Sequence, residues 1–198
     1  MEMVCYHGTT ESYAKRIVER GFTHEPFVQN KNIRLPGDLG CGTYFFLDDT
    51  DYNFNGHNCA LNYAKKFKNK ETSHVSVIKS NIFLETGQYL YMDMDSEDNI
   101  QLFTKAKEKL RNTVNAILND AIRDDGAKKR DNVDGLFIEM MIAKRMINNP
   151  DIIVKRTYTA FNNEHARSNY PNGRELVIRN LSYLTAADNM EIVLTNAL

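Results

Sequence analysis

The chain has 198 residues, of which 42% are hydrophobic and 26% are charged, so it is long enough for one compact domain with its own core. Its 25 Lys and Arg against 26 Asp and Glu give a formal net charge of -1, which excludes a strong overall positive field for nucleic acid or an anionic membrane. The amino-terminal residues lack the pattern of a secretory signal, and no later stretch reaches the roughly 18 consecutive apolar residues that span a bilayer. We therefore expect a cytoplasmic protein with no membrane partner.

The first elements expected along the chain are a strand, a helix and a loop. Residues 3–6 form a short apolar run typical of a strand. Thr9 or Thr10 can then cap a helix, whose apolar residues recur at helical spacing until Gly21 ends it. The segment 21–39 is rich in Asn, Pro and Gly, which indicates a loop.

Sheet-forming segments dominate the next part of the chain. We expect strands at residues 43–47, 75–84 and 88–92, and a helix at 58–67 with an apolar stripe on one face. From 98 to 125 the apolar residues keep a helical period, with charged residues opposite them.

The second half is expected to end in further strands. The charged run 123–131 is predicted to be a solvated turn, although its basic residues leave a nucleic-acid contact open. We expect strands at 133–138, 152–158, 175–178 and 192–194, and a helix at 139–147. Since no repeat or linker interrupts the chain, the sequence predicts a single α+β domain over residues 1–198, with a helical insertion at about 98–130.

Cysteine and histidine usage gives no sign of a disulfide framework or a metal site. The cysteines are odd in number and lack CxxC spacing, which is typical of reduced thiols, and the histidines are scattered. These residues are Cys5, Cys41 and Cys59, and His7, His24, His57, His74 and His165.

Three strings carry residue types that together can bind a cationic ring and its sugar: Tyr6-His7-Gly8-Thr9, Gly40-Cys41-Gly42-Thr43-Tyr44-Phe45 and Arg174-Glu175-Leu176-Val177-Ile178. The ring in the second string can stack on a pyridinium, a cation–π contact worth about 0.5–2 kcal/mol. The imidazole can hydrogen-bond a ribose hydroxyl, and the carboxylate can stabilise a developing oxocarbenium ion. Because nicotinamide leaves NAD as a neutral molecule, one carboxylate suffices where ordinary glycosidases use two.

Each string also has a purely structural interpretation. Tyr44 is typical of a core or sheet-surface aromatic, and His7 before Gly-Thr is typical of a turn. Glu175 can lie in solvent at a strand end or pair with Arg174 or Arg179, because a buried carboxylate without a partner is costly.

Taken together, the strings resemble the motifs of the ADP-ribosyltransferase superfamily in its His-Tyr-Glu form, which diphtheria-type toxins and the poly(ADP-ribose) polymerase family share. The first string resembles the first strand motif of that family, and the second resembles its Gly-x-Gly-x-Tyr-Phe motif. Leu61-Asn62-Tyr63-Ala64 is similar to the helix that carries a second stacking tyrosine, and the third string is similar to the one with the catalytic glutamate. Asp134-Gly135-Leu136-Phe137 resembles a strand that often precedes the glutamate in bacterial and phage relatives.

The resemblance implies a split β-sandwich with an NAD cleft, and NAD as co-substrate without a metal. In it, the histidine orients NAD through a ribose hydroxyl, the glycine holds the carboxamide and two tyrosines sandwich the nicotinamide. The glutamate bonds the 2′-hydroxyl of the nicotinamide ribose and stabilises the cation. The implied catalytic residues are His7, Tyr44 and Glu175, and the implied NAD-binding residues are His7, Gly8, Thr9, Tyr44 and Tyr63.

The chain departs from the family pattern at the expected nicotinamide site and at the position that bears on the acceptor. At the nicotinamide site, Ala60 stands where polymerase-like members often have a serine that bonds the carboxamide, and the stretch between Tyr44 and Tyr63 is longer than in those members. Gly173 precedes Glu175 by two residues, so the Glu-x-Glu pattern of arginine-modifying toxins is missing. The segment 139–173 is expected beside the cleft, and its candidate acceptor contacts are Asn162, Asn163, Glu164, His165 and Arg167.

The sequence therefore predicts a mono-ADP-ribosyltransferase that transfers ADP-ribose to a macromolecular acceptor, either protein or nucleic acid. The resemblance implies a toxin-like effector with an antitoxin as a possible partner. Two alternatives stay open. One is a small-molecule or RNA 2′-phosphate transferase on the same fold, similar to rifamycin-modifying enzymes or tRNA 2′-phosphotransferases. The other is a catalytically silent module that binds NAD or ADP-ribose, or a structural interaction domain.

Overall fold

The computed structural model describes residues 2–28, 34–68, 74–85, 87–121, 132–161, 168–184 and 189–197. The strands are β1 (Glu2–Thr10), β2 (Thr43–Leu47), β3 (His74–Phe83), β4 (Tyr91–Asp93), β5 (Ile152–Thr157), β6 (Gly173–Ile178) and β7 (Met190–Ala197). The helices are α1 (Glu11–Arg20), α2 (Gly56–Phe67), α3 (Glu97–Asp120) and α5 (Asp134–Ala143), with a 3₁₀ turn η1 (Leu181–Leu184).

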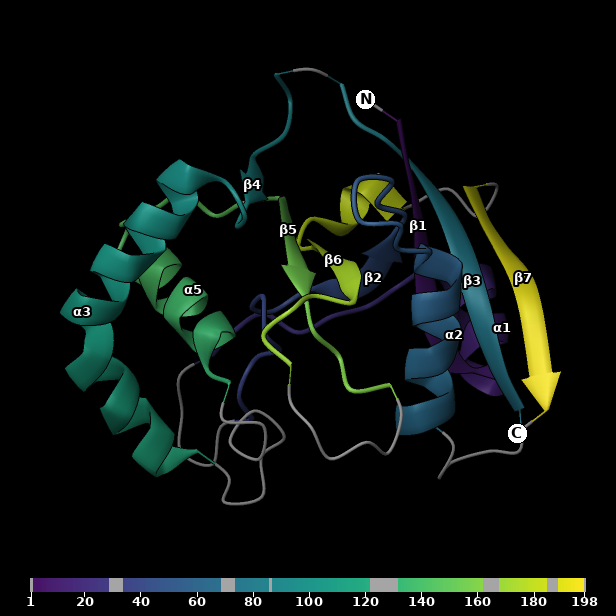
Figure 1. Ribbon diagram of the computed structural model, residues 1–198, viewed down its shortest axis with the longest axis horizontal. Helices are drawn as coiled ribbons and strands as arrows, with labels where there is room; N and C mark the ends of the chain where they lie inside the picture. Colours follow the sequence, from purple (N-terminus) through teal and green to yellow (C-terminus); the bar gives the residue numbers. More distant parts are fainter. Residues whose placement is uncertain are drawn as a thin grey trace.

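The seven strands of the described ranges belong to one mixed sheet in the order β4-β5-β6-β2-β1-β3-β7 (Figure 1). The β4–β5 pair is parallel and the other neighbours are antiparallel. Helices α3 and α5 pack together on the β4–β5–β6 side, whereas α1 and α2 contact β1 and β3. The expected α+β class is confirmed.

The start of the chain has the expected strand and helix, but the expected turn at His7-Gly8 is wrong, because both residues lie inside β1. Thr10 caps α1 by accepting a hydrogen bond from the Tyr13 amide at 3.2 Å, so it is the second of the two expected threonines that caps the helix. Gly21 ends the helix with φ 82°, a conformation that favours glycine. The observed strand β1 is longer than the strand expected at 3–6, because it runs from Glu2 to Thr10. Strand β2 begins and ends where predicted.

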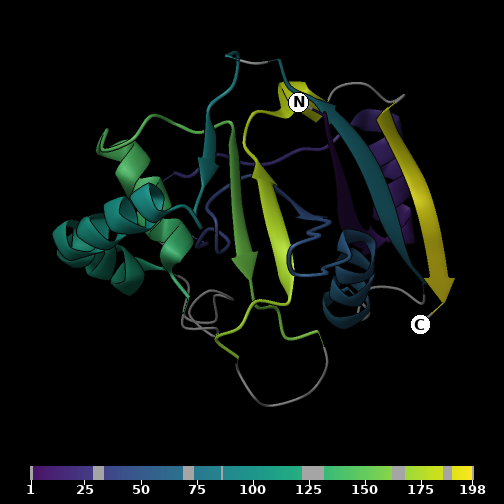
Figure 2. The same ribbon diagram turned by 45° about the horizontal axis from the view of Figure 1, so that its top comes forward.

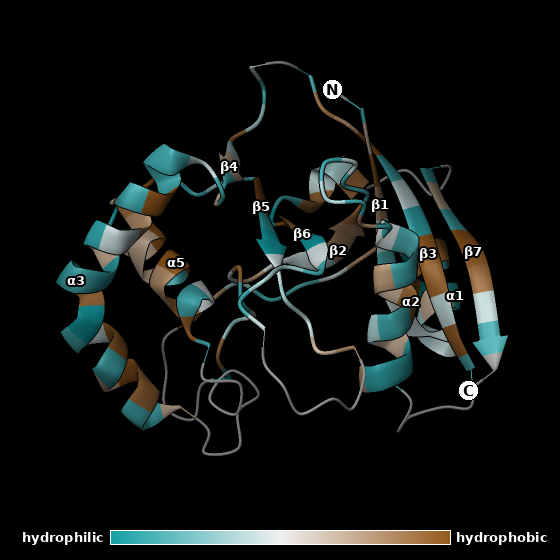
Figure 3. Ribbon diagram, in the orientation of Figure 1, coloured by the Kyte–Doolittle hydropathy of each residue, from teal (hydrophilic) through white to brown (hydrophobic). Residues whose placement is uncertain are grey.

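The prediction of a strand at 133–138 is wrong, because Asp134-Gly135-Leu136-Phe137 begins helix α5. Its run of apolar side chains is buried on every side of the helix, so it has none of the polar stripe that marks a surface helix. A short continuous apolar run fits a buried strand and a buried helix equally well. In Figure 3 most of the α5 ribbon has the brown and pale tones of apolar residues.

The long helix α3 begins at its Ser96 cap and ends earlier than the expected 125. Apolar side chains from its inner face form one cluster with α5 and with Ile153 and Val177 of the sheet. The predicted turn at 123–131 lies within residues 122–131, outside the described part of the chain. Within the described ranges, no helix has both the length and the hydropathy needed to cross a bilayer.

The neighbouring strands β1 and β2 pair over only a short part of their length. β1 pairs with β3 along its whole length from Glu2 to Thr10, but with β2 only at Cys5–Leu47 and Tyr6–Phe46. Past that point β1 and β2 separate, and helix α2 lies near the widening gap, where it also contacts β6 (Figure 2). The edge of β1 after Tyr6 is therefore not paired with β2.

Candidate active site

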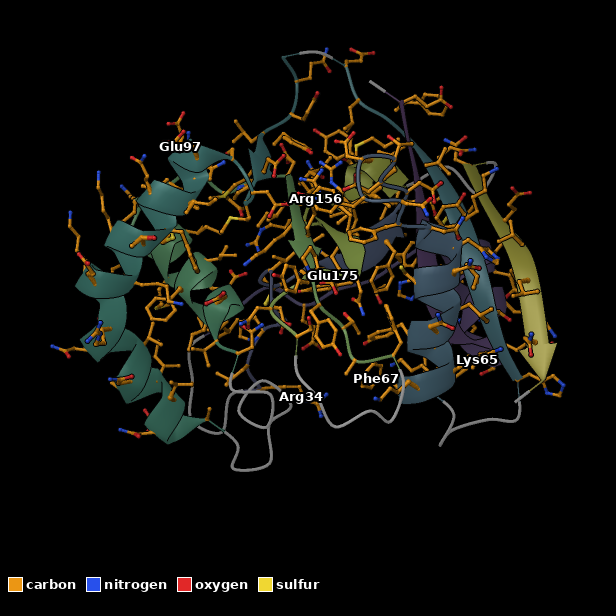
Figure 4. All side chains as sticks on the ribbon, viewed as in Figure 1. Arg34, Lys65, Phe67, Glu97, Arg156 and Glu175 are labelled. Carbon is orange, nitrogen blue, oxygen red and sulfur yellow. The ribbon has the colours of Figure 1, made fainter. Side chains whose placement is uncertain are left out.

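A pocket of about 670 Å³ opens where β1 and β2 separate, a size typical of ligand sites. His7 of β1, Tyr44 of β2, Tyr63 of α2 and Glu175 of β6 all line it. In Figure 4, Glu175 lies near the centre of the molecule, between α5 and α2. The pocket lining also includes Gly8 and Thr9, so it contains each residue that was expected to act in catalysis or NAD binding.

The His7 ring bridges the split. Its Nδ1 lies 2.7 Å from the carbonyl oxygen of Tyr44 and donates a hydrogen bond to it. At this position β1 and β2 are not paired, so the side chain of one strand binds the backbone of the other. The rings of Phe22 and Phe45 hold it edge-on, with centroids at 5.2 and 5.7 Å. Burial lowers the pKa of His7, and the charge of Lys68 lowers it further, while the bond to Tyr44 acts in the opposite direction. A neutral His7 that donates through Nδ1 has Nε2 as an acceptor for a ligand hydroxyl.

Because the pKa of His7 is lowered in the folded protein, we expect the free energy of unfolding to decrease at acidic pH. The unfolded chain binds a proton near pH 6.5, whereas the folded protein binds it only at lower pH, so the free energy of unfolding falls as the pH drops from 6.5 through the folded pKa. Urea denaturation between pH 5 and 8 measures this loss. His7→Asn keeps a donor for the Tyr44 carbonyl without titrating, and its stability should fall less over that range. Equal losses in the two proteins would refute the assignment.

The Tyr44 hydroxyl is anchored in the turn that precedes its strand. It donates to the Gly40 carbonyl at 2.7 Å and accepts from the Leu39 amide at 2.9 Å. A Cβ on Gly37 would lie 2.4 Å from the hydroxyl oxygen, so glycine is needed there for the ring to fit. Burial first, and then the nearby carboxylate of Glu175, raise the pKa of Tyr44 well above its usual value. The phenol therefore stays protonated and its ring is fixed at the pocket wall.

A buried ion pair between Glu139 and Arg179 also contacts the turn that precedes β2. The sequence did not predict this pair. Arg179 contacts both carboxylate oxygens of Glu139, with N–O distances of 2.5 and 3.1 Å. Glu139 also accepts from the Cys41 amide at 2.6 Å, while Arg179 donates to the Cys41 carbonyl at 2.8 Å. Both backbone groups of this residue are therefore bonded to one ion pair, which fixes the chain just before Tyr44.

Glu175 stands opposite Phe46 in the β2–β6 register, two residues from the pair that contains Tyr44. Side chains two residues apart on a strand lie on the same face, as do those of directly opposite residues. Tyr44, Phe46 and Glu175 therefore share one face of the sheet. The Thr159 hydroxyl donates to Glu175 at 3.2 Å. Burial first, and then the charge of Glu175, raise the pKa of Cys59 on α2 to about 11.

Tyr63 belongs to a row of aromatic rings that begins at Phe46 in the pocket and ends at Phe67 of α2. Its ring centroid lies 6.1 Å from that of Phe46 and 4.9 Å from that of Phe67, which is 44% exposed at the end of the helix. Figure 4 shows Phe67 at this end of α2. Tyr63 is therefore held between a strand residue and a surface residue, at the pocket lining.

Gly8 is required by the packing of α2 on β1. A Cβ at this position would lie 1.9 Å from the Ala60 carbonyl oxygen, which is helix backbone. We expect Gly8→Ala to lower the free energy of unfolding by about 1–3 kcal/mol, since the helix must move away from the strand. Gly173→Ala is the matched control, because its nearest neighbours would lie at 3.4 Å and beyond. Thermal melts that show equal stability for both variants would contradict this packing account.

The structure also adds pocket residues that the sequence did not single out. Arg16, Arg20 and Lys68 line the pocket, and Glu175 is the only carboxylate among the lining residues that the structure describes. The candidate acceptor contacts at residues 162–167 lie outside the described ranges. Over the ranges that are described, no three His, Cys, Asp or Glu side chains gather in a way that would hold a metal ion.

Comparison of the chain with protein-family models, with curated proteins and with solved structures finds no match.

Proposed function

We propose that the chain is an ADP-ribosyltransferase that cleaves the nicotinamide–ribose bond of NAD and transfers ADP-ribose to a macromolecular acceptor. The observation that carries the proposal is the convergence of His7, Tyr44, Tyr63 and Glu175, from four separate elements, on one pocket. The resemblance of the motifs to the His-Tyr-Glu superfamily supports the same reaction, and it is the basis for a toxin-like role and an antitoxin partner.

The proposed reaction needs little from the protein besides placement and one negative charge. The bond between ribose C1′ and the pyridinium nitrogen breaks, and its electron pair stays on nicotinamide, which leaves neutral. The Glu175 carboxylate stabilises the positive charge that develops on the ribose. A nucleophilic atom of the acceptor then bonds to C1′ and releases its proton to solvent.

The other pocket residues fit the binding part of this reaction. The fixed ring of Tyr44 offers a face to the pyridinium, with Tyr63 as a second aromatic wall. The free acceptor position on His7 suits a ribose hydroxyl. The split edge of β1 around Gly8 and Thr9 offers backbone groups to the carboxamide, which offsets the missing serine at Ala60.

NAD labelled separately in the nicotinamide ring and in the adenine tests the proposal. We expect the purified protein to release free nicotinamide, and the adenine label to appear on protein or nucleic acid after brief expression in a host, with a mass increment of one ADP-ribose. A preparation that is folded and releases no nicotinamide above the buffer control would contradict the proposal and favour a silent NAD-binding module.

One observation favours a second candidate, the transfer to an RNA 2′-phosphate. That reaction needs a phosphate-binding cleft, and the cations Arg16, Arg20 and Lys68 supply positive charge at the pocket. An oligonucleotide with one 2′-phosphate separates the two candidates, because only the second predicts that the oligonucleotide loses its phosphate when NAD is present.

A further inference from the structure

The positively charged residues of the pocket come from different elements than its carboxylate. Arg16 and Arg20 come from α1 and Lys68 follows the end of α2, whereas Glu175 comes from β6. Three cations thus line a pocket in a chain whose formal net charge is -1.

The two arginines belong to one face of their helix. Tyr13, Arg16, Ile17 and Arg20 are spaced at i, i+3, i+4 and i+7, and all four line the pocket. Two like charges four residues apart repel each other by a few tenths of a kcal/mol, about the strength of a favourable pair at that spacing. An anion bound between them removes this cost.

These cations have no carboxylate partner in the described part of the chain. Arg16 lies over the ring of Tyr13, with 4.6 Å from its guanidinium carbon to the ring centroid. The neighbouring Lys15 differs, since it pairs with Glu11 at 2.7 Å and is not among the residues that line the pocket. Helix carboxyl ends favour cations such as Arg20 and Lys68 in any protein, so the inference depends on all three sharing the pocket.

We propose that Arg16, Arg20 and Lys68 form a subsite for the diphosphate of a dinucleotide. The assignment rests on the proposed function and extends it, because it fixes the direction in which NAD lies. Guanidinium groups bind phosphate oxygens through paired hydrogen bonds, and an ammonium adds a point charge. With the diphosphate on the α1 side, the nicotinamide ribose reaches Glu175 and the adenosine extends away from it. The acceptor therefore approaches from the Glu175 side.

Calorimetric titration with ADP-ribose tests the subsite without any need for catalysis. We expect the double variant Arg16→Gln/Arg20→Gln to weaken ADP-ribose binding about 10- to 100-fold, and Lys68→Gln about 3- to 10-fold. The control Lys15→Gln removes a cation from the same helix outside the pocket and should change the Kd less than about twofold. Nicotinamide riboside, which has no phosphate, should bind all four proteins equally. Thermal melts check that the variants are folded.

The outcomes separate this inference from the proposed function. Binding of ADP-ribose that depends on the arginines supports the subsite even if NAD is not cleaved. Glu175-dependent cleavage of NAD with an unchanged KM in the arginine double variant overturns the subsite and leaves the function standing. Tighter, arginine-dependent binding of a 2′-phosphorylated oligonucleotide than of ADP-ribose overturns the assignment to a diphosphate.

Discussion

Replacing Glu175 with glutamine is expected to lower kcat for nicotinamide release by about 10²- to 10³-fold, the usual cost of losing one transition-state contact. Glutamine keeps the size of the side chain and an acceptor for the Thr159 hydroxyl, so the fold should not change. The KM for NAD should change little, because the lost interaction develops only as the ribose becomes positive.

The matched control for this variant is Glu191→Gln. Glu191 lies on β7, is 61% exposed and pairs with Lys79 at 3.1 Å, away from the pocket lining. Its kcat should equal that of the wild-type protein. Glu175→Gln with normal turnover would exclude the mechanism, whereas equal losses in both variants would indicate a general effect of charge.

Replacing Glu139 with glutamine is expected to lower the free energy of unfolding by about 3–5 kcal/mol, the usual cost of breaking a buried ion pair. The Glu139 and Arg179 side chains are only 4% and 10% exposed, so the variant leaves the arginine as a buried charge without its counter-ion. It also weakens the acceptor for the Cys41 amide, and with it the turn that anchors Tyr44.

Chemical denaturation measures this effect, and Glu191→Gln again serves as control. Its exposed pair with Lys79 should contribute no more than about 1 kcal/mol. Where the Glu139 variant stays folded, its KM for NAD should rise, because the Tyr44 ring is less firmly held. A loss of stability as small as that of the surface control would show that the ion pair does not support the turn.

Much of the sheet could be predicted from the sequence, because its strands carry local signals. The start and end of β2 follow from the glycines before Thr43 and the polar residue after Leu47. The cap and end of α1 follow from Thr10 and Gly21. These features depend on the conformational preferences of single residues, which neighbours in space do not override here.

The error at α5 has a different origin. Its ten residues are almost all apolar, so the side-chain pattern contains no period that distinguishes a helix from a strand. Close packing supplies what the pattern lacks. A Cβ on Gly135 would lie 1.7 Å from the Gly37 carbonyl oxygen, so the helix start touches the turn that holds Tyr44. This contact between residues about a hundred positions apart leaves no trace in either segment alone.

In the candidate site, too, some residues have local sequence signals and others are defined only by contacts in the fold. His7, Tyr44, Tyr63 and Glu175 could be chosen from their motifs, and the structure brings them to one pocket. The Glu139–Arg179 pair and the pocket cations could not, because charged residues in a helix or strand are usually solvated. Their roles depend on burial and on partners that only the fold defines.

A crystal structure of the protein with an NAD analogue whose nicotinamide ribose has a methylene in place of the ring oxygen tests the central claim most directly. This analogue cannot form an oxocarbenium ion, so it stays intact. We predict its nicotinamide ring against Tyr44 and the ribose 2′-hydroxyl within hydrogen-bond distance of Glu175. Binding outside the pocket between β1 and β2, or with the nicotinamide ribose remote from Glu175, would contradict the account.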